Sequence, residues 1–249
     1  MGYSDLGSYG SEIKTPNLDR LASEGTRFCE FYNNSISAPT RASLLTGQYQ
    51  HRAGVGYFAN NLGLPAYQGY INRESLTFAE VLEHGGYHTY LSGKWHVSGR
   101  ENGKEVSQPW QRGFEHSFNA NNGSYFDQGD YVPANATEQQ KKDAAKRKRP
   151  YYKDGQPVEL EPGSYYSTDL ITDNAVDYIK EQTGDKPFVL YLAYTAPHWP
   201  LHALPEDIAK YKGVYDEGWD VIRQRRFEKQ KQLGHIPQNA VLPENEDKL

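Results

Sequence analysis

The stretch SISAPTRASLLTGQ, residues 35–48, brings a serine, a proline and an arginine together at the predicted start of a helix. Ser37 would face the free backbone N–H groups and the positive end of the helix dipole, where an anion prefers to bind. Arg41 follows one turn later and can direct its planar guanidinium group at the same anion. A serine before a helix is usually only an N-cap. Because Arg41 accompanies it, the stretch favours an anion site.

Two further stretches supply cations or proton donors. Lys94 and His96 lie two residues apart in SGKWHVSG, and side chains so spaced in an extended loop project to the same side. His198 lies between two prolines in TAPHWPLH, where a rigid backbone would fix the imidazole, although a stiff surface turn explains it equally well. Together with Arg41 these groups would surround the Ser37 hydroxyl. Such a site suits a divalent oxyanion ester, either sulfate or phosphate.

These side chains need a scaffold, and three helix-then-strand repeats predict one. The expected helices span 15–25, 75–86 and 167–184, and the expected strands span 26–32, 87–91 and 188–194. This order predicts an α/β fold, a mostly parallel sheet flanked by helices. The last strand is apolar throughout and is expected to be buried on both faces. The loops after Tyr32, Leu91 and Tyr194 should share the edge where ligands bind in such sheets.

The other segments and the composition narrow the classes of function. Residues 101–163 have weak periodicity and are expected to form a long irregular excursion near that edge. Cys29, the single cysteine, is expected to be a small core residue. A net charge of −5 argues against a nucleic-acid partner. No apolar run is long enough to span a bilayer, and no signal peptide is visible at Met1.

SAPTRASLLTG resembles the signature of the sulfatases, a family of the alkaline phosphatase superfamily. That signature reads Cys or Ser, any residue, Pro, any residue, Arg, three residues, then Leu-Thr-Gly. The matching residues are Ser37, Pro39, Arg41, Leu45, Thr46 and Gly47. GYSDLGSYG, TPNLDRLASEG, GKWH and APHWP resemble further sulfatase blocks in the family's order. The resemblance therefore covers most of the chain and includes the stretches singled out above.

The resemblance implies an alkaline phosphatase-like fold and a sulfuric ester hydrolase that removes sulfate from an aryl or carbohydrate sulfate. It implies that a maturase oxidises Ser37 to formylglycine, which also becomes a calcium ligand. A plain serine would be left as a stable sulfate ester, whereas a hydrated aldehyde has a second hydroxyl that can expel the sulfate. The serine form points to an anaerobic maturase, unless the serine is an engineered replacement for cysteine.

The resemblance also implies roles for the other residues. Arg41 would hold the hydrate and offset metal-bound charge, and Lys94 would bind sulfate oxygens. His96 would orient or deprotonate the hydrate, and His198 would protonate the leaving oxygen. Ser124 would be a further contact with the substrate. Sulfatases of this type are usually exported to the periplasm or beyond.

The chain departs from the family pattern in its metal ligands. The paired aspartates after the first strand and the later Asp-Asn pair are both missing, and Asp5 does not replace them. We therefore expect 1–249 to be a partial N-terminal catalytic domain, truncated at both ends and without the first strand and the C-terminal subdomain. On its own this chain should have little activity and bind calcium weakly.

Three alternatives remain at this point. The same site could hydrolyse phosphate or phosphonate monoesters, because it would accept either anion. A non-catalytic protein that binds sulfated glycans would leave Ser37 unmodified. A structural α/β fragment without a site would require every motif to be coincidence.

Overall fold

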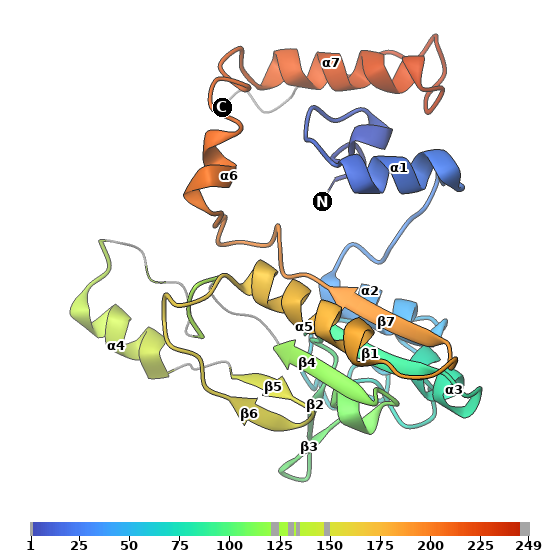
Figure 1. The fold of residues 1–249 in the computed structure, drawn as a ribbon, viewed down its shortest axis with the longest axis vertical. Coiled ribbons are helices and arrows are strands. Elements are labelled where there is room, and N and C mark those ends of the chain that lie inside the picture. The colour runs from blue at the N-terminus through green and yellow to red at the C-terminus, as the bar shows by residue number, and fades with distance from the viewer. Residues whose placement is uncertain (1, 121–124, 129–131, 133–134, 147–149, 245–249) are drawn as a thin grey trace. The chain divides into compact units, whose positions relative to one another are not determined.

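The computed structural model describes the chain apart from residues 1, 121–124, 129–131, 133–134, 147–149 and 245–249 (Figure 1). It divides into two compact units. One comprises Met1–Tyr32 with Ala203–Leu249, and the other comprises Asn33–His202. All the described residues that the sequence proposes for the site belong to the second unit.

The second unit is built on a five-stranded sheet in the order β6-β5-β4-β1-β7. β1 (His88–Lys94) pairs in parallel with both β4 (His116–Ala120) and β7 (Phe188–Ala193). β5 (Tyr151–Lys153) pairs antiparallel with β4, and β6 (Gln156–Val158) pairs antiparallel with β5. Four strands therefore run in one direction and only β5 runs in the other. The predicted mostly parallel sheet is confirmed. Its parallel strands end together at the edge of the candidate site.

Helices cover both faces of this sheet (Figure 1). α5 (Ser167–Glu181) packs on the face of Tyr90 and Phe118 and buries Ile171 and Tyr178 there. α2 (Ser37–Thr46) and α3 (Phe78–His84) belong to the core on the other face, around Leu91 and Trp95. The alternation of side chains along β1 therefore divides the interior into two cores.

Two strand predictions are wrong. Residues 26–32 form no strand, and Phe28, Phe31 and Tyr32 are exposed there. No described strand pairs with this segment, so its aromatic residues, although typical of strands, have no ladder to join. Cys29, expected in the core, is exposed in the same segment. β7 lies at the edge of the described sheet, so Phe188 and Leu192 are partly exposed and the strand is not buried on both faces.

Residues 101–163 are more regular than the sequence suggests. A small hairpin of β2 (Gly99–Glu101) and β3 (Lys104–Val106) precedes the short helix η2 (Pro109–Gln111). β4, β5 and β6 follow within the main sheet, with α4 (Glu138–Lys146) between β4 and β5. Three-residue strands are too short for an alternating pattern to stand out, which explains why they were missed.

The first unit contains η1 (Gly7–Tyr9), α1 (Pro16–Glu24), α6 (Pro205–Ala209) and α7 (Trp219–Gln232). α1 matches the predicted helix, with Pro16 in its first turn. Arg226 of α7 pairs with Glu12 at 2.7 Å and with Asp5 at 2.8 Å. Hydrogen bonds from Arg226 hold the Glu12 pKa at about 2, against a usual value of 4.5. None of the described helices is long and apolar enough to cross a membrane.

Candidate active site

Ser37 is the first residue of α2, and its hydroxyl does not cap the helix. Ile36 occupies the N-cap position with an extended backbone. The hydroxyl oxygen of Ser37 instead accepts a hydrogen bond from Nε of Arg41, at 3.1 Å. The ordinary explanation of a serine at this position, a plain N-cap, therefore does not apply.

Arg41 connects α2 to two strands of the sheet. Its Nη1 donates to the backbone oxygen of Lys94 at 2.7 Å and to the hydroxyl of Tyr191 at 3.2 Å. Burial raises the pKa of Tyr191, and the nearby Arg41 partly offsets this. The phenol thus stays protonated at neutral pH and can accept from Arg41 through its oxygen. One guanidinium group therefore connects Ser37 to the end of β1 and to the side chain of Tyr191 in β7.

Lys94 is the last residue of β1 and is buried, whereas the sequence placed it in a loop. The strand runs three residues past the predicted end at Leu91 because Ser92, Gly93 and Lys94 continue the parallel pairing with β4. A buried ammonium group is costly unless acceptors or an anion match it. The ammonium group of Lys94 therefore requires polar partners at this position.

His96 lies two residues beyond β1 and is partly buried. Its backbone has φ 63°, in the left-handed region. The expectation that Lys94 and His96 project to one side assumed an extended loop, so that argument fails. The short distance along the chain still keeps His96 close to the end of β1.

His198 is exposed in the segment that follows β7, between the cis peptide bonds Ala196–Pro197 and Trp199–Pro200. Its Nδ1 lies 2.5 Å from the backbone oxygen of Trp199. A carbonyl oxygen only accepts, so Nδ1 carries the hydrogen and Nε2 is the ring atom left for chemistry. The backbone oxygen of His198 also accepts a hydrogen bond from the hydroxyl of Tyr125 at 2.9 Å.

The structure therefore joins Ser37, Arg41 and the end of β1 directly. Across the described part of the chain, no hydrogen bond or ion pair links His198 to Ser37 or Arg41. Ser124 lies outside the described residues. Tyr191 was missed by the sequence reasoning. The signal was its hydroxyl, the one polar group in the otherwise apolar strand β7, shortly before the loop that carries the predicted histidine.

The described residues around Ser37 do not fit calcium. Calcium takes six to eight oxygen ligands, mostly from carboxylates and carbonyls. Within the described ranges, no three His, Cys, Asp or Glu side chains gather where they could hold a metal ion. The charged group in contact with Ser37 is instead the cation of Arg41. These residues by themselves would hold an anion and not a hard cation.

The comparison with known families decides the class of protein. A family model described as Sulfatase matches residues 1–238. The chain belongs to the sulfatase family. An uncharacterized sulfatase of Schizosaccharomyces pombe is 37% identical over 253 residues, covering 97% of this chain and 44% of that relative. The arylsulfatase of Klebsiella aerogenes is 34% identical over 247 residues, covering 98% of this chain and 50% of that relative. This sulfatase chain thus spans about half the length of these two relatives.

Solved structures show the same fold. The structure of Ps i-CgsB in complex with k-i-k-neocarrahexaose has a TM-score of 0.69 and 28% identity, covering 94% of this chain and 53% of that one. A protein solved with its substrate D-glucosamine-2-N,6-O-disulfate has a TM-score of 0.61 and 29% identity, covering 86% of this chain and 36% of that one. The alkaline phosphatase-like fold of the sulfatase family is thereby confirmed.

Proposed function

We propose that the whole protein is a sulfuric ester hydrolase that removes sulfate from an aryl or carbohydrate sulfate. Residues 1–249 are proposed to belong to its catalytic domain. Membership of the sulfatase family supports the reaction class. We assign the reaction to this site because of the hydrogen bond from Arg41 to Ser37. The Ser37 hydroxyl makes this bond and does not cap the helix, so it is available for another role.

We propose that Ser37 is oxidised to formylglycine by a maturase that recognises its motif. The modification would supply a hydrated aldehyde, the nucleophile that a plain serine cannot replace in a turnover cycle. The place of Ser37 supports this, because the side chain is only partly buried and its one described polar contact is with Arg41. Arg41 would hold the hydrate through the same contact.

The remaining residues are proposed to act on the substrate. Lys94 would bind sulfate oxygens and His96 would orient or deprotonate the hydrate, since both lie at the end of β1 where Arg41 also binds. His198 would protonate the leaving oxygen through Nε2. Ser124 would be a further contact with the substrate. Calcium is proposed as the metal ion of the whole protein, with ligands that the described residues do not supply.

The nature of the substrate is proposed from the relatives. One is named arylsulfatase, and one related structure contains the disulfated sugar D-glucosamine-2-N,6-O-disulfate as its substrate. We infer an aryl or carbohydrate sulfate, which would be met in the periplasm or outside the cell.

The test is turnover of a chromogenic aryl sulfate with added calcium, by the whole protein co-expressed with an anaerobic maturase. Mass spectrometry of the Ser37 peptide should show the loss of two hydrogen atoms. Sulfate release by the matured protein, lost in the Ser37→Ala variant, is the expected result. A matched aryl phosphate and phosphonate should turn over far more slowly. A faster reaction with either would overturn the assignment to sulfate, and an unmodified Ser37 would favour a protein that only binds sulfated glycans.

A further inference from the structure

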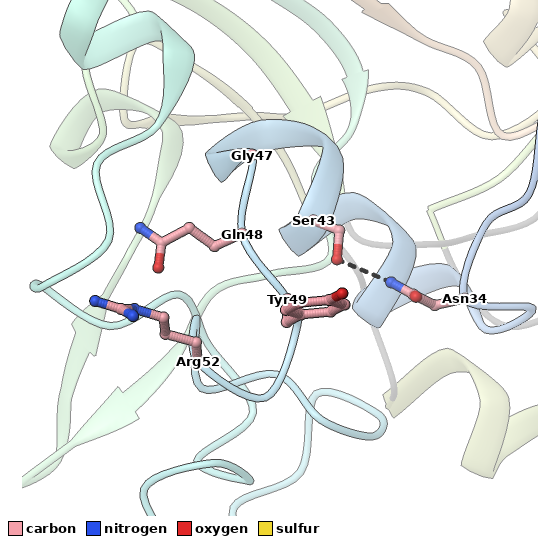
Figure 2. A pocket seen from close by; sticks show the side chains of 6 residues that line it. All are labelled: Asn34, Ser43, Gly47, Gln48, Tyr49 and Arg52. Carbon is pink, nitrogen blue, oxygen red and sulfur yellow. Dashed lines mark hydrogen bonds between the residues drawn. The ribbon is translucent and has the colours of Figure 1, made fainter.

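A pocket of about 670 Å³ opens beside α2 in the second unit (Figure 2). Its lining comes from the segment before α2, from the helix itself and from the loop after it, namely Asn34, Ser43, Gly47, Gln48, Tyr49 and Arg52. Ser43 follows Arg41 by two residues, which is about 200° around the helix. The pocket and the contacts of Arg41 with the sheet therefore lie on different sides of α2. Its volume falls within the roughly 300–1,000 Å³ typical of small-molecule sites.

Arg52 gives this pocket a positive charge. Its side chain is exposed, and no carboxylate in the described part of the chain forms an ion pair with it. Three other arginines of the same unit each pair with a glutamate: Arg73, Arg100 and Arg112. The guanidinium group of Arg52 is thus available to an external anion, which it can hold with two parallel hydrogen bonds.

Polar groups of both kinds lie around this cation. The Oε1 atom of Gln48 is buried and has no hydrogen-bond partner among the described residues. An unsatisfied buried acceptor is costly, and rotation of the Gln48 side chain toward the pocket would let a ligand hydroxyl satisfy it. On the other side of the pocket, Ser43 Oγ accepts a hydrogen bond from Nδ2 of Asn34 at 2.9 Å, which leaves the serine proton free to donate. After this rotation of Gln48 the pocket offers an acceptor as well as the donor of Ser43.

Tyr49 adds an apolar surface to these polar groups. Its side chain is 83% exposed, so one face of the ring is open to a ligand. In Figure 2 the hydroxyl end of Tyr49 points toward Asn34 and Ser43. The Arg52 side chain extends to the same side of the loop as the amide of Gln48. An open aromatic face beside amides and an arginine matches a sugar ring with an anionic substituent. The C–H face of the sugar packs on the ring, its hydroxyls meet the amide and its anion meets the guanidinium group.

We propose that this pocket binds an acidic sugar unit, separately from the site at Ser37. The anion lies on Arg52, the sugar ring on Tyr49 and the hydroxyls on Gln48 and Ser43. The acidic sugar class follows from the lining residues. The narrower statement, that the anion is a sulfate ester on the same kind of glycan that the enzyme hydrolyses, rests on the proposed function.

The test uses the full chain with Ser37→Ala, which cannot turn over a sulfate ester. N-acetylglucosamine 6-sulfate, N-acetylglucosamine and inorganic sulfate are titrated in turn while the backbone amide NMR signals of Gly47, Gln48 and Tyr49 are followed. The sulfated sugar should shift these signals to saturation. Adding Arg52→Gln should weaken its binding by about tenfold, since a charge-assisted hydrogen bond is lost. Adding Arg73→Gln, the matched control at another exposed arginine, should leave binding unchanged.

Several outcomes would overturn the proposal. One is that the sulfated sugar causes no saturable shift of the NMR signals. Another is that Arg52→Gln leaves the affinity for the sulfated sugar unchanged. A third is that inorganic sulfate or the neutral sugar binds as tightly as the sulfated sugar. Tighter binding of glucuronic acid than of the sulfated sugar would support an acidic sugar as the ligand but overturn the statement that its anion is a sulfate ester. Since no hydrolysis is measured, failure here leaves the sulfatase proposal standing. A lack of turnover in the whole protein would equally leave a positive binding result standing.

Discussion

Arg41 makes three side-chain hydrogen bonds, to Ser37, to the backbone of Lys94 and to Tyr191. A single guanidinium group thus orients the Ser37 side chain and connects it to the sheet. Lysine could not reproduce this, because it offers one point charge where arginine offers a planar fork. At the scale of the residue, the site is organised by this one side chain.

We expect Arg41→Lys to lower kcat of the matured whole protein on an aryl sulfate by at least about 100-fold, as a misplaced nucleophile loses orientation. Tyr191→Phe removes only one of the three bonds, and should cost about 1 kcal/mol of folding free energy with a much smaller effect on kcat. Steady-state kinetics and thermal unfolding of both variants check this. Equal losses of kcat in the two variants would contradict the role given to Arg41.

Glu12 supplies a prediction about pH. Its pKa is lowered to about 2 by hydrogen bonds from Arg226, against a usual value of 4.5. The ion pair therefore stabilises the fold fully above pH 4.5 and loses this effect as the pH falls from 4.5 toward 2. The melting temperature of the wild type should exceed that of Glu12→Gln near neutral pH, and the difference should shrink in this window. A constant difference between pH 6 and about 2 would contradict the assignment.

At the scale of elements, the edge of the sheet depends on how closely β1 approaches β7. Gly93 pairs with Ala193 across the two strands and has φ 118°. A Cβ atom at Gly93 would collide with the backbone oxygen of Ala193. The glycine of the SGK sequence is thus required for the strands to end side by side, next to Lys94.

Gly93→Ala should cost more folding free energy than Gly86→Ala. Gly86 also has a positive φ, 85°, but a Cβ there meets no atom within 4 Å. Gly86→Ala should therefore cost only the backbone strain, about 1–2 kcal/mol. The collision in Gly93→Ala adds to that strain. Chemical denaturation of the two variants measures the difference, and equal costs would show that β1 and β7 can separate freely at this point.

Over the whole molecule, the described residues place one cation, Arg41, against Ser37 and include no cluster of metal ligands. We therefore expect calorimetric titration of this 249-residue chain with calcium to show no binding of micromolar strength. A version of the protein with added flanking sequence serves as the comparison. Micromolar binding by the present chain would mean that its oxygen ligands have been misjudged.

The family and the residues of its signature could be read from the amino-acid sequence alone, because Ser37, Pro39 and Arg41 are recognised by their local spacing around a helix start. The α/β class could also be read from it, since α5 has a helical period and β7 is a short apolar run that follows a glycine turn. Only the tertiary structure showed that residues 26–32 form no strand and that β7 is an edge strand, because pairing depends on neighbours far along the chain. The contact of Arg41 with Tyr191 is likewise visible only in the folded structure, since the two residues lie 150 positions apart in the sequence.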